Sequence, residues 1–249
     1  MQTEAFPLRI DVLGVGFDDV TLEEAADIGG VLAGSEGFSY VVTPNPEFLL
    51  QAKKDEEFRA VLNGAGLVLA DGVGVVKAAG ILGRPLKGRV PGIDFAARLL
   101  AHMAKTGRRL FLLGAKPGVA ETAAANLQKQ YPGLMVCGTH DGYFKEDGPI
   151  VAEIREAHAD VVFVCLGAPR QEFWMARNGK DTGAHLMVGL GGSLDVFSGV
   201  VERAPEAWQK TGMEWLYRLL KEPRRIGRMA KLPMVLVDAA VCRVSGRRK

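Results

Sequence analysis

The stretch VVTPNPEFLLQAKKDEEFRAVLNGAGLVLADGVG, residues 41–74, contains two apolar runs that each end in polar residues. The first run leads into Thr43 and Asn45, and the second leads into Asp71. The segment between them is long enough for a helical connection, so the stretch predicts two parallel strands. Because parallel strands end along one edge of a sheet, where ligands bind, we expect these three side chains to share a pocket. Asp71 also suits a turn or a helix N-cap, and the stretch alone leaves that alternative open.

Downstream of residue 108, apolar runs alternate regularly with helical segments. We expect strands at 110–113, 134–138, 161–166 and 185–189, most of them followed by a glycine-rich turn. Strands separated by helices in this way imply right-handed crossovers and a parallel sheet. The runs are almost continuously apolar, as expected when helices cover both faces. The sequence therefore predicts an α/β fold with a Rossmann-like parallel sheet flanked by helices.

The residues around this region add further expected elements. Residues 9–15 form a strand candidate that ends in the glycines of GVGFDD. This motif lacks the third glycine of a dinucleotide fingerprint, and its two aspartates would repel a pyrophosphate, which argues against an NAD-dependent oxidoreductase. Thr21 and Glu24 form a capping box that opens a helix. Further helices are expected at 75–82, with Asp71 as a cap, and at 92–105.

Composition bounds the class of protein. The 249 residues are 48% hydrophobic and 24% charged, which is typical of a globular protein with a sizeable core. The three cysteines lack the spacing of a disulfide framework or a zinc site; we expect Cys137 and Cys165 to be core residues in a reducing cytosol. There is no signal-peptide pattern and no apolar run long enough to span a bilayer.

Charge is distributed unevenly along the chain. Residues 203–249 hold 12 basic and 4 acidic residues, a balance of +8, although the whole chain carries only +2. Such a tail suits an anionic partner, namely a membrane surface, a nucleic acid or a phosphorylated substrate, or else it is solvated charge. Residues 211–220 form an amphipathic helix pattern followed by arginines, which suits an interfacial membrane contact or docking on the body. We therefore divide the chain into an α/β domain, 1–205, and a basic helical appendage, 206–249.

The strand ends favour a phosphorylated ligand. Glycine next to a helix start exposes backbone N–H groups that bind anions, as a nucleotide diphosphate requires. The sequence has no Walker motif and no Asp-x-Asp pair for a divalent metal, and adjacent His140 and Asp141 would chelate a metal poorly. The basic loop 83–91 contains Arg89, which either holds phosphate or belongs to a solvated connection.

Eight motifs occur in an order that resembles the WecG/TagA/CpsF glycosyltransferases over residues 9–232. They are TPN at 43–45, ADGVG at 70–74, RVPG at 89–92, LLGA at 112–115, HDGYF at 140–144, LGAPRQE at 166–172, GGSLDVFSG at 191–199 and RAPE at 203–206. The segment after Leu232 is not part of this pattern.

The resemblance implies an activity. Members transfer a sugar from a UDP-sugar to an undecaprenyl-diphosphate-linked acceptor, with inversion and without a metal or other cofactor. It implies N-acetylmannosamine transfer to N-acetylglucosaminyl-diphospho-undecaprenol in teichoic acid linkage-unit synthesis, at the inner face of the cell membrane, with no nucleic acid partner. Alternatives are UDP-N-acetylmannosaminuronic acid or UDP-glucose as donor, for common antigen or capsular polysaccharide, and a non-catalytic nucleotide- or lipid-binding protein. Homo-oligomerisation stays open.

The resemblance also gives roles to residues. Asp71 matches the general base, Thr43 and Asn45 match neighbours that orient a sugar, and Gln171 matches a residue at the sugar or diphosphate. The remaining matches are substrate-binding positions, with the arginines as candidate cations for the departing UDP: Gly114, Tyr143, Gly192, Asp195, Arg89, Arg218, Arg224 and Arg225.

Overall fold

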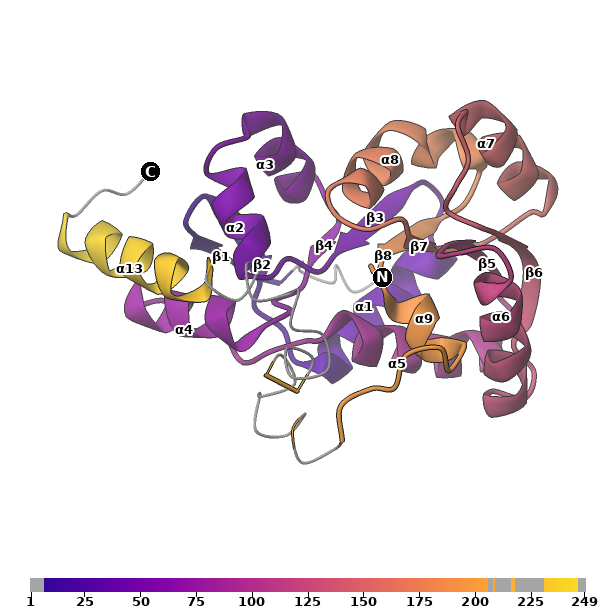
Figure 1. The fold of residues 1–249 in the computed structure, drawn as a ribbon, viewed down its shortest axis with the longest axis horizontal. Coiled ribbons are helices and arrows are strands. Elements are labelled where there is room, and N and C mark those ends of the chain that lie inside the picture. Colours follow the sequence, from indigo (N-terminus) through magenta and orange to yellow (C-terminus); the bar gives the residue numbers. More distant parts are fainter. Residues whose placement is uncertain (1–6, 206–207, 209–215, 218–230, 246–249) are drawn as a thin grey trace.

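A six-stranded parallel sheet forms the centre of the protein. The structure is a computed structural model that describes residues 7–205, 208, 216–217 and 231–245. The strand order is β4-β3-β8-β7-β5-β6, and every pairing between these strands is parallel (Figure 1). The strands are β3 (Ser39–Val42), β4 (Leu67–Val68), β5 (Arg109–Gly114), β6 (Met135–His140), β7 (Val161–Cys165) and β8 (Leu186–Gly189). The predicted Rossmann-like α/β fold is confirmed.

Helices cover both faces of the sheet. One face packs against α2 (Pro46–Ala52), α3 (Glu56–Asn63), α7 (Asp147–Glu156) and α8 (Arg170–Asn178), the last followed by a 3-10 turn η1 (Gly179–Thr182). The opposite face packs against α1 (Leu22–Gly34), α5 (Gly92–Thr106), α6 (Val119–Gln130) and α9 (Ser193–Phe197). Helix α4 (Val73–Ile81) lies beyond the β4 edge with the C-terminal helix α13 (Lys231–Val244).

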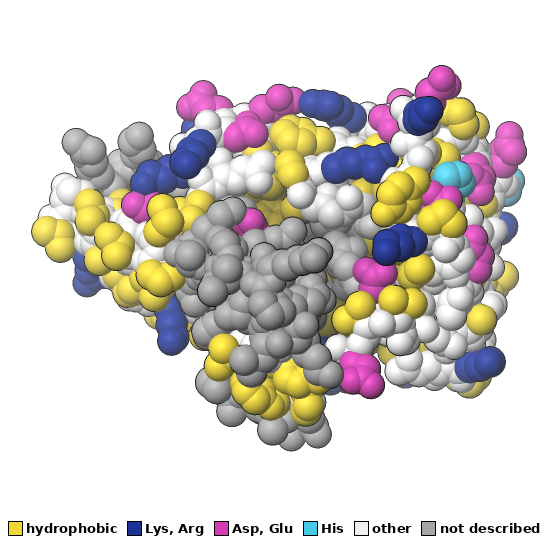
Figure 2. All heavy atoms as spheres, viewed as in Figure 1, with side chains coloured by type: hydrophobic (Ala, Val, Ile, Leu, Met, Phe, Trp, Pro, Cys, Tyr) yellow, Lys and Arg dark blue, Asp and Glu magenta, His cyan; other side chains and the backbone are white. Residues whose placement is uncertain are grey.

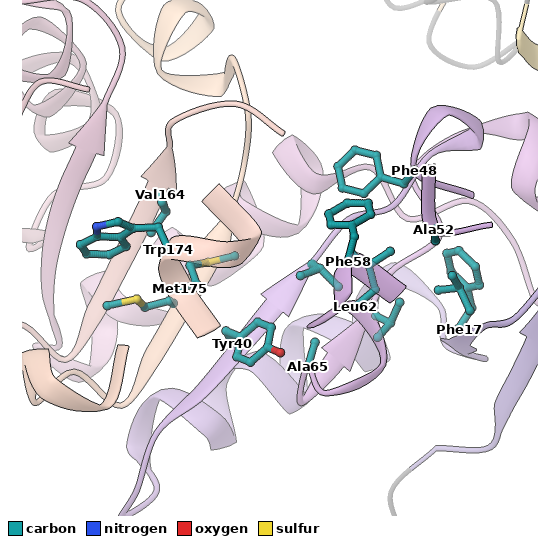
Figure 3. Close-up of a cluster of buried hydrophobic side chains, with 14 of the residues drawn as sticks. Phe17, Tyr40, Phe48, Ala52, Phe58, Leu62, Ala65, Val164, Trp174 and Met175 are labelled. Carbon is teal, nitrogen blue, oxygen red and sulfur yellow. The ribbon is translucent and has the colours of Figure 1, made fainter. Parts of the chain in front are cut away.

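Alternation along the strands divides the core into two layers. Val42 belongs to the cluster that contains Phe58 and Trp174, whereas Val41 belongs to the cluster that contains Phe95. Figure 3 shows part of the first cluster, with side chains from α3 and α8 converging on the sheet. Successive strand residues point to opposite faces, so a doubly covered strand has to be apolar at every position. This explains the continuous apolar runs in the sequence.

The predicted strand at 9–15 is confirmed over its first four residues and wrong beyond them. β1 (Arg9–Val12) ends at a turn, and β2 (Val15–Asp18) pairs with it in an antiparallel hairpin that is separate from the main sheet. Its turn residues, Leu13 and Gly14, have φ angles of 56° and 90°. Two successive positive φ angles give the tight turn whose twist matches a hairpin. Gly14 therefore belongs to the turn that reverses the chain between β1 and β2.

The hairpin covers the edge strand β4. Asp18, which is 5% exposed, accepts a hydrogen bond from the Val68 N–H at 2.7 Å and pairs with Arg9 at 3.1 Å. Burial raises the pKa of Asp18, while the Val68 N–H and Arg9 oppose that shift. A covered edge strand has fewer unpaired backbone groups for another chain to bind. The strand that leads to Asp71 is thereby held from both sides.

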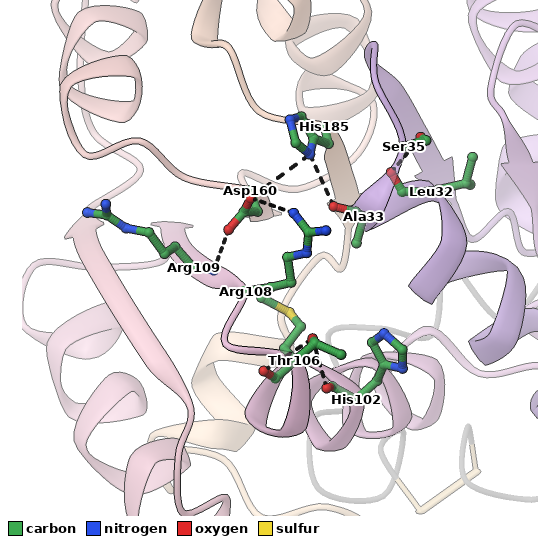
Figure 4. A network of polar contacts seen from close by, with 10 residues as sticks. Leu32, Ala33, Ser35, His102, Thr106, Arg108, Arg109, Asp160 and His185 are labelled. Atoms are coloured by element: carbon green, nitrogen blue, oxygen red, sulfur yellow. Dashed lines mark hydrogen bonds and ion pairs between the residues drawn. The ribbon is translucent and has the colours of Figure 1, made fainter.

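A polar network ties the amino ends of three strands together (Figure 4). Asp160 accepts hydrogen bonds from the Arg109 backbone N–H at 2.7 Å and from the Arg108 guanidinium at 3.1 Å. Its own carbonyl accepts from the His185 N–H at 2.9 Å, and the His185 ring contacts the Ala33 carbonyl at 3.2 Å. These bonds join β5, β7, β8 and α1 at the edge opposite the polar strand ends. They fix the strand register on which the other edge depends.

The C-terminal helix α13 packs against helices α4 and α2. Val235 and Ala239 are fully buried against α4 and α2, and Asp238 forms an ion pair with Lys53 at 2.8 Å. Its outward face is apolar and exposed at Met234, Val237, Val241 and Val244, at the end of the molecule where Figure 2 shows hydrophobic side chains gathered. Among the residues that the structure describes, no helix has the length and apolar character to cross a membrane.

The strand order creates one crevice suited to a ligand. From β5 the chain passes through α6 to β6 on one side, whereas β7 and β8 lie on the other side of β5. Connections that leave two adjacent strands in opposite directions open a crevice at their carboxyl ends. At this switch point the Ala115 N–H donates to the Cys165 carbonyl at 3.2 Å.

Candidate functional site

Thr43 and Asp71 lie together at the carboxyl ends of β3 and β4, as the sequence predicted. The Asp71 N–H donates to the Pro44 carbonyl at 3.1 Å, so the two strand ends remain joined beyond the sheet. The backbone N–H of Gly92, at the start of α5, donates to Asp71 Oδ2 at 3.4 Å. A side chain added at Gly92 would contact Thr43 Oγ1 at 3.2 Å. Both predicted residues therefore meet the first residue of α5.

The predicted cap of α4 by Asp71 was wrong. The N-cap residue of α4 is Gly72, which has no side chain with which to cap the helix. Gly72 has a φ of 140°, which favours glycine, and a Cβ there would lie 3.3 Å from the Pro46 ring. This conformation separates the Asp71 carboxylate from α4 and directs it to the amino end of α5. The partial positive charge of that helix end favours an ionised carboxylate.

Thr43 connects this strand end to the middle of the sheet. Its hydroxyl donates to the Gly189 carbonyl at 3.3 Å, at the end of β8. The side chain is half-buried, as is that of Asp71. Thr43 is therefore held in place by backbone contacts from β8 on one side and α5 on the other.

Asn45 is the N-cap of α2. Its Oδ1 accepts hydrogen bonds from the backbone N–H groups of Glu47 at 2.8 Å and Phe48 at 3.4 Å. Pro46 occupies the first helical position, where a missing N–H costs nothing. The sequence Asn-Pro-Glu was a recognisable cap signal that the motif-based interpretation did not use. The Asn45 amide nitrogen makes no hydrogen bond within the described part of the chain, so it remains the polar group for the predicted sugar contact.

Arg89 lies beside the same strand end. The N–H of its neighbour Val90 donates to the Ala70 carbonyl at 2.9 Å, which brings the basic loop against the residue that precedes Asp71. Lys87 of the same loop is directed elsewhere, because it pairs with Glu24 at 2.8 Å. The structure thus brings the backbone of the loop that carries Arg89 next to the strand end that carries Asp71.

A pocket of about 510 Å³ opens at the switch point between β5 and β7. Its lining combines charged and aromatic side chains from loops after four strands, including Ala115, Lys116, Tyr143, Leu166, Arg170 and Asp195. Tyr143 is 69% exposed at the mouth. Two of the predicted substrate-binding residues, Tyr143 and Asp195, therefore share one cavity although they lie far apart in the sequence.

Hydrogen bonds order the loop that carries Tyr143. Asp141 Oδ1 accepts from the Tyr143 N–H at 2.7 Å, and the Gly142 N–H donates to the Ala115 carbonyl at 2.9 Å. Arg170 donates to the Gly142 carbonyl at 2.7 Å, and its guanidinium stacks 4.6 Å from the centre of the Phe144 ring. An arginine fixed by carbonyl and aromatic contacts keeps further N–H donors for an anion.

Gly114 and Gly192 have structural roles next to the pocket. Gly114 has a φ of 130°, and a Cβ there would collide with the Cys165 backbone, so the close approach of β5 and β7 requires glycine. Gly192 precedes α9, whose first N–H groups face the Cys165 thiol.

Burial raises the pKa of Cys165 to about 12, so the thiol stays neutral. Cys165 is buried, as expected, and Cys137 is half-buried with its thiol donating to the Leu110 carbonyl at 3.3 Å.

Gln171 lies beneath the strand ends, between the pocket and the Thr43–Asp71 pair. It is 2% exposed, and its Oε1 accepts from the Gly191 N–H at 3.0 Å. Its Nε2 donates to Glu172 Oε1 at 2.7 Å. The amide therefore bonds the turn after β8 on one side and a buried carboxyl group on the other.

The sequence interpretation did not select three residues that the structure places at the site. Lys116 and Arg170 line the pocket, and Glu172 contacts Gln171. The available signal for the first two was a basic residue in the segment that follows a strand on either side of the switch point: Lys116 after β5, and Arg170 at the start of α8 after β7. Glu172 gave no such signal, because an acidic residue in the first turn of a helix is ordinary.

The remaining predictions concern the arginines of the C-terminal tail and a metal site. Arg218, Arg224 and Arg225 lie outside the described residues, as does most of the predicted helix at 211–220. Within the described residues, no cluster of three or more His, Cys, Asp or Glu side chains has the arrangement of a metal site. His140 contacts the Asp141 carbonyl at 2.8 Å, so this pair belongs to the pocket-rim loop.

Comparison with known proteins shows the family of the chain. Residues 10–249 match the glycosyl transferase WecG/TagA/CpsF family. Proteins named N-acetylglucosaminyldiphosphoundecaprenol N-acetyl-beta-D-mannosaminyltransferase from Staphylococcus aureus strains MW2, NCTC 8325 and MRSA252 are each 36% identical over 234 residues. The alignments cover 93% of this chain and 92% of each relative. The chain therefore belongs to the WecG/TagA/CpsF family and is a glycosyltransferase.

Proposed function

We propose that the protein transfers N-acetylmannosamine from UDP-N-acetylmannosamine to N-acetylglucosaminyl-diphospho-undecaprenol, in the assembly of a teichoic acid linkage unit. The names of the Staphylococcus aureus relatives support this donor sugar and this acceptor. The observation that carries the proposal is the pairing, on one sheet edge, of a nucleotide-sized pocket at β5 and β7 with a carboxylate at β4. A transferase needs both, because donor and acceptor have to meet at one reacting carbon.

In the proposed reaction the acceptor hydroxyl attacks the anomeric carbon of the donor. Asp71 accepts the hydroxyl proton as the new carbon–oxygen bond forms and the bond to UDP breaks. The carboxylate and the pocket occupy separate strand ends, which supports attack opposite the leaving group and hence inversion. Thr43 and Asn45 orient the sugars beside Asp71, with the Asn45 amide nitrogen as one donor.

The pocket is proposed to hold UDP. Tyr143 at its mouth offers a flat face to the uracil base, and the Asp195 carboxylate offers acceptors for ribose hydroxyls. The turns at Gly114 and Gly192 shape the floor, and Gln171 lies beneath them at the side of the sugar and diphosphate.

UDP gains negative charge as it leaves, and cations stabilise that charge. Arg89 is the proposed cation on the Asp71 side, together with Arg218, Arg224 and Arg225 of the basic tail. The proposal assigns this work to arginines and none of it to a metal ion. Assays in excess EDTA test this point: unchanged turnover supports the arginine mechanism, and abolished turnover that a divalent metal restores contradicts it.

The C-terminal appendage, 206–249, is proposed to bind the inner face of the cell membrane, where the lipid-linked acceptor lies. Two observations support this: the +8 charge balance of residues 203–249 and the exposed apolar face of α13. Basic residues combined with an apolar helix face favour an interfacial contact. Truncation before Thr211 should lower turnover even with a soluble acceptor analogue if the tail arginines act on UDP; unchanged turnover would remove them from the mechanism.

The decisive experiment is a screen of donors by UDP release, with a short-chain N-acetylglucosaminyl diphospholipid as acceptor. We expect the fastest release with UDP-N-acetylmannosamine. Preference for UDP-N-acetylmannosaminuronic acid or UDP-glucose would keep the reaction class and replace the donor. UDP binding without turnover of any donor would overturn the proposed transfer and favour a binding protein.

A further inference from the structure

Glu172 is a buried carboxyl group without the partners that such groups usually have. It is fully buried, and its Oε2 makes no hydrogen bond with any described residue. The buried Asp18, by comparison, has both an arginine and a backbone N–H as partners. Burying a carboxyl group in this way costs stability, and an apolar side chain of similar size would avoid that cost. The position therefore calls for an explanation other than packing.

The one hydrogen bond of Glu172 determines the orientation of Gln171. The Gly191 N–H can only donate, so it requires the carbonyl oxygen of the Gln171 amide, which lies 3.0 Å away. The amide nitrogen then faces Glu172 Oε1 at 2.7 Å. An acceptor at that oxygen keeps the amide in this orientation, whereas an apolar side chain would leave a buried N–H unsatisfied.

The oriented amide supports the turn that joins β8 to α9. A Cβ at Gly189 would lie 3.0 Å from Gln171 Nε2, so the turn packs directly on the amide. On its other side, the Gly189 carbonyl accepts the Thr43 hydroxyl. Gly191 has a φ of 54°, and the chain continues from it to Asp195 in the pocket. The same short turn thus contacts the Thr43–Asp71 side and carries a pocket residue.

We propose that Glu172 is a positioning residue for glycosyl transfer: through Gln171 it fixes the β8–α9 turn and so keeps the nucleotide pocket in register with Asp71. The hydrogen bond from Gln171 needs only an acceptor at Glu172 Oε1. When the carboxyl group is protonated, the proton sits on the unpartnered Oε2, so Oε1 still accepts the bond. Burial raises the pKa of Glu172 to about 7, so both forms exist near neutral pH and both retain that acceptor. A small shift between reacting groups lowers the rate far more than it lowers binding.

Three variants of α8 test the inference. Glu172→Gln keeps the acceptor, Glu172→Leu removes it at similar volume, and Trp174→Phe is a matched control. Trp174 is also buried in α8, but its indole donates to Asp147 Oδ1 at 3.0 Å, on the α7 side. The measurements are kcat, KM for the UDP-sugar, UDP affinity and the melting temperature of each variant.

We expect Glu172→Leu to lower kcat at least about tenfold while UDP affinity changes by less than about threefold, since the other pocket residues come from β5, β6 and β7. Glu172→Gln should keep kcat within about threefold of the parent protein. Trp174→Phe should lower the melting temperature and leave kcat unchanged. A parent-like kcat in Glu172→Leu, loss of kcat in Glu172→Gln, or equal kcat losses in Glu172→Leu and Trp174→Phe would each overturn the inference.

The measurement of kcat rests on the proposed transfer reaction. A second measurement therefore tests the positioning role of Glu172 independently of that reaction. Hydrogen exchange at the Gly191 amide needs no substrate. Protection in the parent and in Glu172→Gln, with loss in Glu172→Leu but not in Trp174→Phe, supports the positioning role even if the donor screen fails. Equal protection in all four proteins contradicts it.

Discussion

The two ends of the carboxyl edge of the sheet are built differently. At β3 and β4 the polar side chains are half-buried and bonded to backbone: Thr43 to Gly189, Asn45 to the first turn of α2, and Asp71 to Gly92. At β5 and β7 the pocket instead includes three exposed side chains, those of Lys116, Tyr143 and Arg170. Groups that take part in bond breaking need fixed geometry, whereas groups that admit and release a nucleotide need access to solvent. We therefore expect substitutions at the first end to lower kcat and substitutions at the second to weaken nucleotide binding.

The largest expected effect is that of Asp71→Asn. Loss of the proposed general base should lower kcat roughly 10²–10⁴-fold, while UDP affinity stays within about twofold of the parent, because the pocket is separate. Steady-state kinetics and calorimetric titration with UDP give the two numbers. Asp55→Asn is the matched control: Asp55 is also half-buried and caps α3 through Oδ1, and asparagine caps equally well. Parent-like turnover in Asp71→Asn would remove Asp71 as the base.

Glu172, which supports the turn between the two ends through Gln171, gives a prediction for how the stability of the folded protein depends on pH. Burial raises the pKa of Glu172 to about 7 from 4.5, so between these values the folded state binds a proton that the unfolded state has lost. Stability from this group is then present below about pH 4.5, falls as pH rises, and levels off above pH 7. At about 1.4 kcal/mol per unit, the loss is roughly 3 kcal/mol.

Denaturant unfolding of the parent and Glu172→Gln at pH 5 and pH 8 measures this loss. The parent should become less stable relative to the variant as pH rises, because glutamine does not titrate. The difference between the two proteins cancels the titration of histidines and other groups common to both. A difference that stays constant with pH would mean that Glu172 ionises in the folded protein as readily as in the unfolded chain.

A smaller effect is expected for Arg170→Ala at the open end. Removal of the guanidinium takes a cation from the pocket and releases the Gly142 carbonyl, so the Kd for UDP should rise about tenfold with kcat little changed. Arg177→Ala is a close control, since Arg177 also belongs to α8 and stacks on an aromatic ring, Phe173, at 5.0 Å. Equal affinities for UDP in the two variants would exclude Arg170 from the nucleotide site.

The smallest predicted effect separates two roles of Asn45. Asn45→Ala should destabilise the protein by about 1 kcal/mol, because the N-cap of α2 is lost. Asn45→Asp keeps an oxygen in the capping position, so its stability should match the parent while its kcat falls, since the amide nitrogen is gone. Thermal unfolding and kinetics measure both. A parent-like kcat in Asn45→Asp would leave Asn45 as a cap alone.

The sequence predicted best the features that follow from hydrophobic periodicity and from the rule that parallel strands end at one edge of the sheet. Continuous apolar runs separated by helices were sufficient for the parallel sheet, and the rule for strand ends placed Thr43 next to Asp71. Contacts between distant residues were the source of error. The N–H that Asp71 accepts comes from Gly92, 21 residues later, and no local pattern announces it. The first strand ends earlier than predicted for a local reason, the positive φ angle of Leu13, which a leucine rarely adopts.

The pocket could be anticipated only in part. Tyr143 and Asp195 were recovered through the family motifs, but Arg170 depends on how one loop folds over another. Glu172 could not be recognised, because its burial is decided by the packing of α8 and not by its neighbours in sequence. First-turn acidic residues are ordinarily solvated, and the same residue type can occupy either environment.

The docking of α13 also bears on when the protein becomes complete during synthesis. Lys53 pairs with Asp238, 185 residues later in the chain. Ribosomes add about 5–20 residues per second, so the apolar surface of α2 and α4 waits roughly 10 to 40 s before Val235 and Ala239 are made. Those helices begin directly after Asn45 and Gly72, so the strand ends that carry the proposed chemistry gain their final support last. A nascent chain released before α13 would carry the sheet but leave its first helices uncovered and open to chaperones.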